Sequence, residues 1–208
     1  MSDRLIERSL RVFSDDLSSD APVPGGGSAA AYAGAMGAGL AAMVARISIK
    51  KEKSEALESF VEETDNLRSD FLRLVDDDSA AYARVAAAMK LPRKTDDEKQ
   101  ERQERMQAAL LAASRVPLEI AETARRLLGA CERGAASASP MTASDIGVGA
   151  LMAETALRGA ALNVMINLAS VKDSAQVKAI SEHLDRAVDG SDEQLRRITD
   201  SVESRIAR

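Results

Sequence analysis

Apolar residues recur along most of this chain at intervals of three and four, the spacing that places them on one face of an α-helix. No segment shows the sustained alternation that indicates a strand. The predicted helices cover residues 4–17, 29–48, 54–89, 96–131 with an interruption near Pro117, 144–168, and a last amphipathic stretch running from about 174 to 202. No linker between them is long enough to separate domains. We therefore expect one all-α domain over residues 1–208, a helical bundle of about six helices.

The second predicted helix, 29–48, is apolar on every side. Its large residues fall on one stripe, and the others are mostly alanine and glycine, which allow neighbouring helices to approach closely. The stripe consists of Tyr32, Met36, Leu40, Met43 and Ile47. The uncharged stretch 21–45 is long enough to span a bilayer, yet it opens with prolines and glycines and is poor in Leu and Ile. We expect a buried helix rather than a membrane span, and the core of a symmetric homodimer is a natural place for it.

Composition excludes several classes of function. The chain has 208 residues, 45% of them hydrophobic, which is enough to fold around a core without disulfides. A net charge of −5 argues against DNA or RNA as the partner. The single cysteine, Cys131, and the single histidine, His183, exclude an internal disulfide, a thiolate metal site and two-histidine metal motifs. The first eleven residues do not resemble a signal peptide, so we expect a cytoplasmic protein that needs no metal.

A glycine-rich segment precedes the second predicted helix, and Ser28 is placed where a helix N-cap is expected. Free N–H groups at a helix start favour an anion, and glycines let a ligand approach the backbone. The alternative is a flexible loop followed by an ordinary cap. The spacing is not that of a dinucleotide-binding or P-loop motif. The candidate ligand-binding residues of this segment are Pro24, Gly25, Gly26, Gly27 and Ser28.

Asp78 lies on the inward stripe of the third predicted helix. It follows Phe71 by seven residues, which returns to within about 20° of the same direction, whereas Asp76 and Asp77 point elsewhere. Burial raises the pKa of a carboxyl group, and a raised pKa suits a group that exchanges protons near neutrality. The alternatives are an exposed position after a small register shift, or a structural salt bridge.

Two further groups of polar residues are candidates for ligand binding. Asn163 and Asn167 lie one turn apart and could orient a heterocycle, or could simply join two helices. Asp145 near the start of the same helix is also an ordinary helix-start residue. Lys50 and Lys53 end the second helix, where they could meet an anionic ligand or be solvated.

Six segments, in order, resemble motifs of the formiminotransferase-cyclodeaminase and methenyltetrahydrofolate cyclohydrolase family. They are Ala21-Pro-Val-Pro-Gly-Gly-Gly-Ser-Ala-Ala-Ala31, Leu74-Val-Asp-Asp-Asp-Ser-Ala-Ala-Tyr82, Leu91-Pro-Arg-Lys-Thr95, Val116-Pro-Leu118, Ser144-Asp-Ile-Gly-Val148 and Leu162-Asn-Val-Met-Ile-Asn-Leu168. Two positions depart from the family pattern. Tyr82 stands where the family usually has Phe, and Met165 where it often has a basic residue.

The resemblance implies a helical homodimer that binds a reduced folate and needs no other cofactor. Members of this family open 5,10-methenyltetrahydrofolate with water to give 10-formyltetrahydrofolate, or close 5-formiminotetrahydrofolate with release of ammonia. The family's catalytic aspartate falls in the segment that contains Asp76 and Asp78, so both are candidates. We expect the first reaction, because this domain stands without a transferase domain. The second reaction and a non-catalytic folate-binding module are the alternatives.

We also expect a particular placement of the folate on these candidate residues. The glycine segment is expected to hold an anionic or carbonyl part, such as the tail glutamate, with help from Lys50 and Lys53. Asn163 and Asn167 are expected to orient the pterin, and Tyr82 and Asp145 complete the expected binding set.

Overall fold

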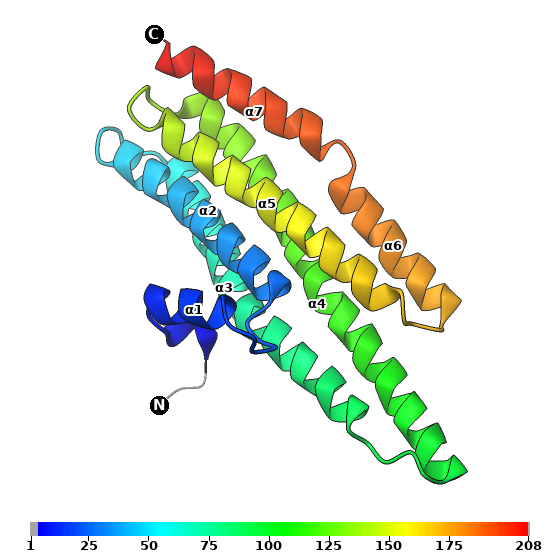
Figure 1. Cartoon of the computed structure of the whole chain (residues 1–208). Coiled ribbons are helices and arrows are strands. Elements are labelled where there is room, and N and C mark those ends of the chain that lie inside the picture. The colour runs from blue at the N-terminus through cyan, green and yellow to red at the C-terminus, as the bar shows by residue number, and fades with distance from the viewer. Residues whose placement is uncertain (1–3, 208) are drawn as a thin grey trace.

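The computed structural model describes residues 4–207 and is all-helical over that range, with no strand (Figure 1). Its elements are η1 (Leu5–Glu7), α1 (Leu10–Leu17), α2 (Gly26–Ile49), α3 (Glu55–Met89), α4 (Asp96–Ser137), α5 (Ala143–Leu168), α6 (Ser174–Val188) and α7 (Ser191–Ile206). The prediction of an all-α bundle is confirmed.

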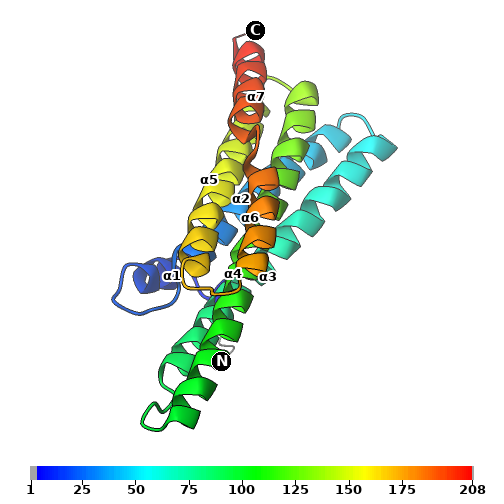
Figure 2. The same cartoon turned by 90° about the vertical axis from the view of Figure 1, so that its right-hand side faces the viewer.

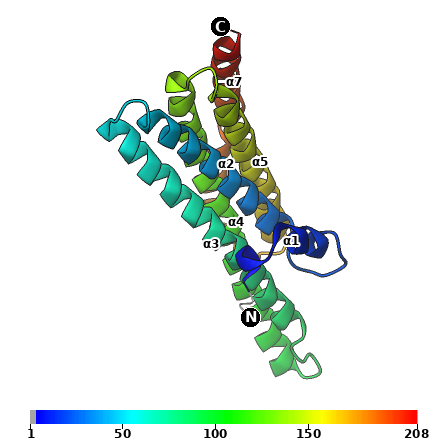
Figure 3. The ribbon, with the colours of Figure 1, turned by 90° about the vertical axis from the view of Figure 1, so that its left-hand side faces the viewer.

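Four long helices, α2 to α5, form the body of the bundle. α2 packs against α3 and α5, and α4 packs against α3 and α5. α6 and α7 follow one another along the outer side of α4 and α5 (Figures 1 and 2). α3 and α4 continue beyond the start of α2 as a two-helix arm, and α1 lies beside the start of α2 (Figure 3). The start of α2, the arm and the end of α5 therefore meet at one end of the body.

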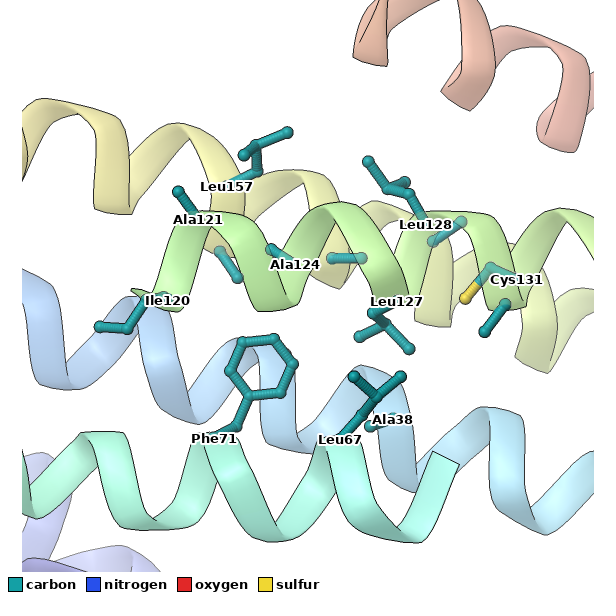
Figure 4. Packing of buried hydrophobic residues seen from close by; sticks show 14 of the residues in the cluster. Ala38, Leu67, Phe71, Ile120, Ala121, Ala124, Leu127, Leu128, Cys131 and Leu157 are labelled. Carbon is teal, nitrogen blue, oxygen red and sulfur yellow. The ribbon is translucent and has the colours of Figure 1, made fainter. Parts of the chain in front are cut away.

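The core depends on small residues in α2. Most of its alanines and glycines are buried, so α3 and α4 bring Phe71, Leu67 and Leu127 close to its backbone (Figure 4). A Cβ at Gly34 would lie 2.5 Å from Cζ of Phe71, which shows how closely α3 approaches. By contrast Met36 and Met43, on the large-residue stripe, are 41% and 38% exposed. α2 is long and apolar enough to cross a membrane by composition, yet its small-residue face is packed inside the bundle.

The prediction of an interruption near Pro117 was wrong, because α4 is one helix that contains this proline. Proline has no N–H to bond the carbonyl four residues earlier, which is Ala113. That carbonyl accepts a hydrogen bond from Nδ2 of Asn167 at 2.9 Å. A side chain from α5 therefore replaces the missing bond and lets α4 continue.

Two other element boundaries differ from prediction. The last predicted helix is divided into α6 and α7 by Gly190, whose φ of 68° is left-handed. The first predicted helix is the short η1 followed by α1, and Ser9 caps α1 by accepting from the N–H of Val12 at 3.3 Å.

Candidate active site

The glycine segment starts α2 in a different register from the predicted one. Gly25 is the N-cap and α2 begins at Gly26, so the prediction that Ser28 is the N-cap was wrong. A glycine cap has no side chain to accept the free N–H groups of the first turn. A carboxylate from α3 takes this role, because the N–H of Ser28 donates to Oδ2 of Asp78 at 2.8 Å.

Ser28 and Asp78 form the centre of the site. Oγ of Ser28 lies 2.9 Å from Oδ2 of Asp78 and 3.0 Å from the carbonyl oxygen of Val75, and it can donate to either. Oγ of Ser79 is a further neighbour at 3.3 Å. The N–H and the hydroxyl group of Ser28 thus hold Asp78 against α2. The side chain of Asp78 points inward, as predicted.

The pKa of Asp78 is raised above that of an ordinary aspartate. Burial is the larger cause, since it disfavours the charged form, and the two hydrogen bonds from Ser28 partly oppose it. Gly27 makes this approach possible, because a Cβ at that position would lie 2.6 Å from Cγ of Asp78. The combination is a partly buried carboxyl group with a fixed direction, which is what a general acid or base requires.

The neighbouring aspartates have other partners. Oδ1 of Asp76 accepts from the N–H of Leu5 at 2.7 Å and its Oδ2 from Nε of Arg4 at 2.9 Å, so Asp76 joins the N-terminal segment to α3. Asp77 forms an ion pair with Arg73 at 2.6 Å. Asp76 is therefore already engaged by the N-terminal segment, and Asp78 alone faces the glycine segment.

Asn163 lies beside the glycine segment, and Asn167 has a structural partner. A Cβ at Gly26 would lie 3.3 Å from Nδ2 of Asn163, which also donates to the carbonyl of Gly159 at 2.8 Å. Nδ2 of Asn167 donates to the carbonyl of Ala113, so Asn167 joins α5 to α4. This contact is the structural role that the sequence left open as the alternative to ligand binding. Tyr82, one turn after Asp78, is 42% exposed and open to a ligand.

Lys50, Lys53 and Asp145 lie at the other end of the body. α2 has 24 residues and is therefore about 36 Å long, which separates both lysines from Ser28 by nearly its whole length. Asp145 is in the first turn of α5, whereas Asn163 is in its last turns. Within one chain, these three residues and Asp78 do not form one site.

The fold and the site define a class of protein: an all-helical bundle that holds a partly buried carboxyl group of raised pKa at a glycine-rich helix start. A family model described as formiminotransferase-cyclodeaminase matches residues 9–186. The chain belongs to this family, as the motifs predicted.

Three relatives illustrate the match. Methenyltetrahydrofolate cyclohydrolase of Methylorubrum extorquens is 35% identical over 201 residues, covering 95% of this chain and 97% of the relative. Formimidoyltransferase-cyclodeaminase of Sus scrofa is 32% identical over 98% of this chain, which spans only 38% of that protein. The crystal structure of formiminotetrahydrofolate cyclodeaminase from Thermotoga maritima has a TM-score of 0.84 at 27% identity, covering 95% of this chain and 97% of that one.

Proposed function

We propose that this protein hydrolyses 5,10-methenyltetrahydrofolate to 10-formyltetrahydrofolate. The observation that carries the proposal is the Asp78 carboxyl group, partly buried and held by both Ser28 groups against the start of α2. The relative from M. extorquens, which the chain matches along almost its whole length, carries the cyclohydrolase name.

In the proposed reaction Asp78 moves one proton. Water adds to the methenyl carbon, and the Asp78 carboxylate takes the proton that the water loses. The bond from this carbon to N5 then breaks, N5 takes the proton back from Asp78, and the hydroxyl proton leaves to solvent as the formyl group forms on N10. A carboxyl group with a raised pKa can accept and return a proton near neutrality.

The reduced folate is proposed to lie across the start of α2. The N–H groups of Gly26 and Gly27 precede the first α2 hydrogen bond, which runs from the N–H of Ala29 to the carbonyl of Gly25 at 3.0 Å. They are therefore suited to a carbonyl or anionic group of the ligand. Asn163 and Tyr82 flank this position on α5 and α3. The reaction as proposed uses no other cofactor, and a reducing cytoplasm suits the lone buried thiol of Cys131.

The alternative function is cyclodeamination, which the same site could support. N10 would attack the formimino carbon of 5-formiminotetrahydrofolate, and the N10 proton would pass to the formimino nitrogen. Protonated Asp78 would supply the second proton to this nitrogen, which leaves as ammonia as its bond to the carbon breaks and the methenyl cation forms. The T. maritima structure and the animal relatives carry this name.

The test of the two reactions follows the absorbance of methenyltetrahydrofolate. We expect the purified protein to accelerate loss of this chromophore in neutral buffer. Growth of the chromophore from 5-formiminotetrahydrofolate, without accelerated loss, would replace the proposal by cyclodeamination. Folate binding without either change would indicate a non-catalytic module.

We also propose that the protein is a homodimer formed through α2 and α5. These adjacent helices expose large apolar side chains, and soluble proteins rarely leave such a surface uncovered. The residues are Met36, Met43, Val148, Leu151, Leu162, Met165 and Ile166. A second copy can cover this surface with the same residues, because a two-fold interface is self-complementary.

Charge at the centre of this surface should separate the two copies. We expect the unaltered protein to have twice the 22.1 kDa chain mass by light scattering, and the double variant Met36→Glu, Leu151→Glu to have the single mass. Ile206→Glu, on an exposed position of α7, is the control and should remain dimeric. A single-chain mass for the unaltered protein at micromolar concentration would contradict the proposal.

A further inference from the structure

The two oxygens of the Asp78 carboxyl group have different surroundings. Among residues 4–207, the hydrogen bonds to this group come from Ser28 alone, and both end on Oδ2, at 2.8 Å from the N–H and 2.9 Å from Oγ. Oδ1 instead lies against Gly27, because a Cβ at this glycine would overlap Oδ1 more closely than Oδ2. One oxygen is thus held by the protein, and the other faces the glycine backbone.

Oδ1 lies beside the place where the substrate is proposed to bind. The N–H groups of Gly26 and Gly27 precede the first hydrogen bond of α2, and neither residue has a side chain that would separate a ligand from Oδ1. Oδ1 can accept a proton without breaking a bond to the protein, whereas protonation of Oδ2 would weaken two. The geometry therefore favours Oδ1 of Asp78 as the oxygen that exchanges the proton.

The hydroxyl group of Ser28 has two acceptors within reach. Its Oγ lies 2.9 Å from Oδ2 of Asp78 and 3.0 Å from the carbonyl oxygen of Val75, and Ser28 is fully buried. A hydrogen bond to an ionised acceptor is stronger than one to a neutral acceptor, so the hydroxyl proton should point to Oδ2 when Asp78 is ionised. When Asp78 is neutral, the Val75 carbonyl is the better acceptor, because an amide oxygen is more basic than the carbonyl oxygen of a carboxylic acid.

We propose that Ser28 is a positioning residue for the proton transfer: it holds Oδ2 of Asp78, leaves Oδ1 to exchange the proton, and turns its hydroxyl group between Oδ2 and the Val75 carbonyl as the charge of Asp78 changes. The inference rests on the proposed function. In that reaction Oδ1 takes the proton that the attacking water loses and returns it to N5, so Asp78 ends the cycle as a carboxylate. Within the protein only a hydroxyl hydrogen changes direction, and the carboxyl group stays in place.

Charged neighbours of this carboxyl group on α3, α4 and the N-terminal segment form pairs with one another. The pairs are Asp76 with Arg4, Asp77 with Arg73, Glu119 with Arg73, and Asp16 with Arg8. The first turns of α2 carry no charged residue, and α5 presents an amide beside them. Burial raises the pKa of the carboxyl group and the bonds from Ser28 lower it, with no charged side chain among the causes. Loss of the Ser28 hydroxyl group should therefore raise this pKa further.

The test measures kcat/KM against pH for the unaltered protein, Ser28→Ala and Ser28→Cys. The acid limb of this profile reports the pKa of the base in the free enzyme. Loss of a hydrogen bond to a carboxylate should move the limb of Ser28→Ala to higher pH by about one unit. The limb of Ser28→Cys should move less, because a thiol is a weak donor. Cysteine is also close to serine in size, so this variant retains the comparison if the alanine variant does not fold.

Ser79→Ala is the matched control, because it removes a hydroxyl group one atom further from the carboxylate. Oγ of Ser79 lies 3.3 Å from Oγ of Ser28 and makes no hydrogen bond to Asp78, so the acid limb should stay in place. A merely structural role for Ser28 predicts instead that the rate falls by the same factor at every pH. That result for Ser28→Ala, or an equal displacement of the limb in Ser79→Ala, overturns the proposal.

Direct titration separates this proposal from the proposed reaction. In protein labelled with carbon-13 at its aspartate carboxyl groups, the Asp78 resonance is the one that Asp78→Asn lacks, and its midpoint can be measured without turnover. A midpoint displaced to higher pH by Ser28→Ala, and not by Ser79→Ala, supports the inference even where methenyltetrahydrofolate is not hydrolysed. An unchanged midpoint in Ser28→Ala overturns the inference whatever the reaction is.

Discussion

Replacing Asp78 by asparagine should lower kcat/KM by about 10²–10⁴-fold, the contribution expected of a positioned general acid or base. The amide has nearly the shape of the carboxyl group and can still accept a hydrogen bond from Ser28, but it cannot exchange a proton. The measurement is the initial rate of chromophore loss, with circular dichroism to verify the helical fold. A variant with full activity and unchanged fold would exclude Asp78 from the chemistry.

Thermal unfolding of the same variant distinguishes this role from a structural one. Burial raises the pKa of Asp78 above its unfolded value, so the group stabilises the fold relatively more when protonated, and that advantage is lost as the pH rises through the folded pKa. At neutral pH the buried carboxylate therefore lowers the free energy of unfolding relative to a neutral group, and asparagine removes this destabilisation. We expect Asp78→Asn to have an unchanged or higher melting temperature at pH 7; a large decrease would indicate a mainly structural carboxylate.

Replacing Gly27 by alanine should reduce kcat/KM by about 10²-fold, as a displacement of about 1 Å in a reacting group can do. The new Cβ would lie 2.6 Å from Cγ of Asp78, so the carboxyl group must turn away and lose its contacts with Ser28. Alanine also favours a helix over glycine by about 1 kcal/mol, which offsets part of the lost hydrogen bonding. The main change should therefore appear in turnover rather than in stability.

Gly25 provides the matched control for this variant. A Cβ at Gly25 would meet no atom within 4 Å, and its φ of −123° is accessible to alanine. Gly25→Ala should retain activity within a few-fold of the unaltered protein. If both variants lose activity equally, flexibility of the segment matters more than its contact with Asp78.

The inward direction of Asp78 could be predicted because it depends only on helical periodicity. Its position relative to Phe71 on one long helix requires no knowledge of neighbouring helices. The partner of Asp78 could not be predicted, since the contact with Ser28 joins residues 50 positions apart and depends on how closely α2 and α3 pack. Gly27 was predicted to contact a ligand, whereas its close neighbour in the structure is the side chain of Asp78.

Predictions that relied on local rules were wrong where a distant residue compensates. Pro117 would break an isolated helix, but Asn167 from α5 satisfies the carbonyl that proline leaves free. Lys50 and Lys53 were predicted to help the glycine segment hold the tail glutamate of a folate. The length of α2 then places the two groups at opposite ends of the bundle. Residues that border the same helix can therefore lie too far apart in one chain to share a site.

The most direct test of the account is the rate at which methenyltetrahydrofolate absorbance decays with the purified protein, compared with Asp78→Asn and with buffer alone. The account predicts rapid loss with the unaltered protein and a rate near that of buffer for the variant. Equal, accelerated loss with both proteins would contradict the role of Asp78, and loss no faster than buffer with the unaltered protein would contradict the proposed hydrolysis itself.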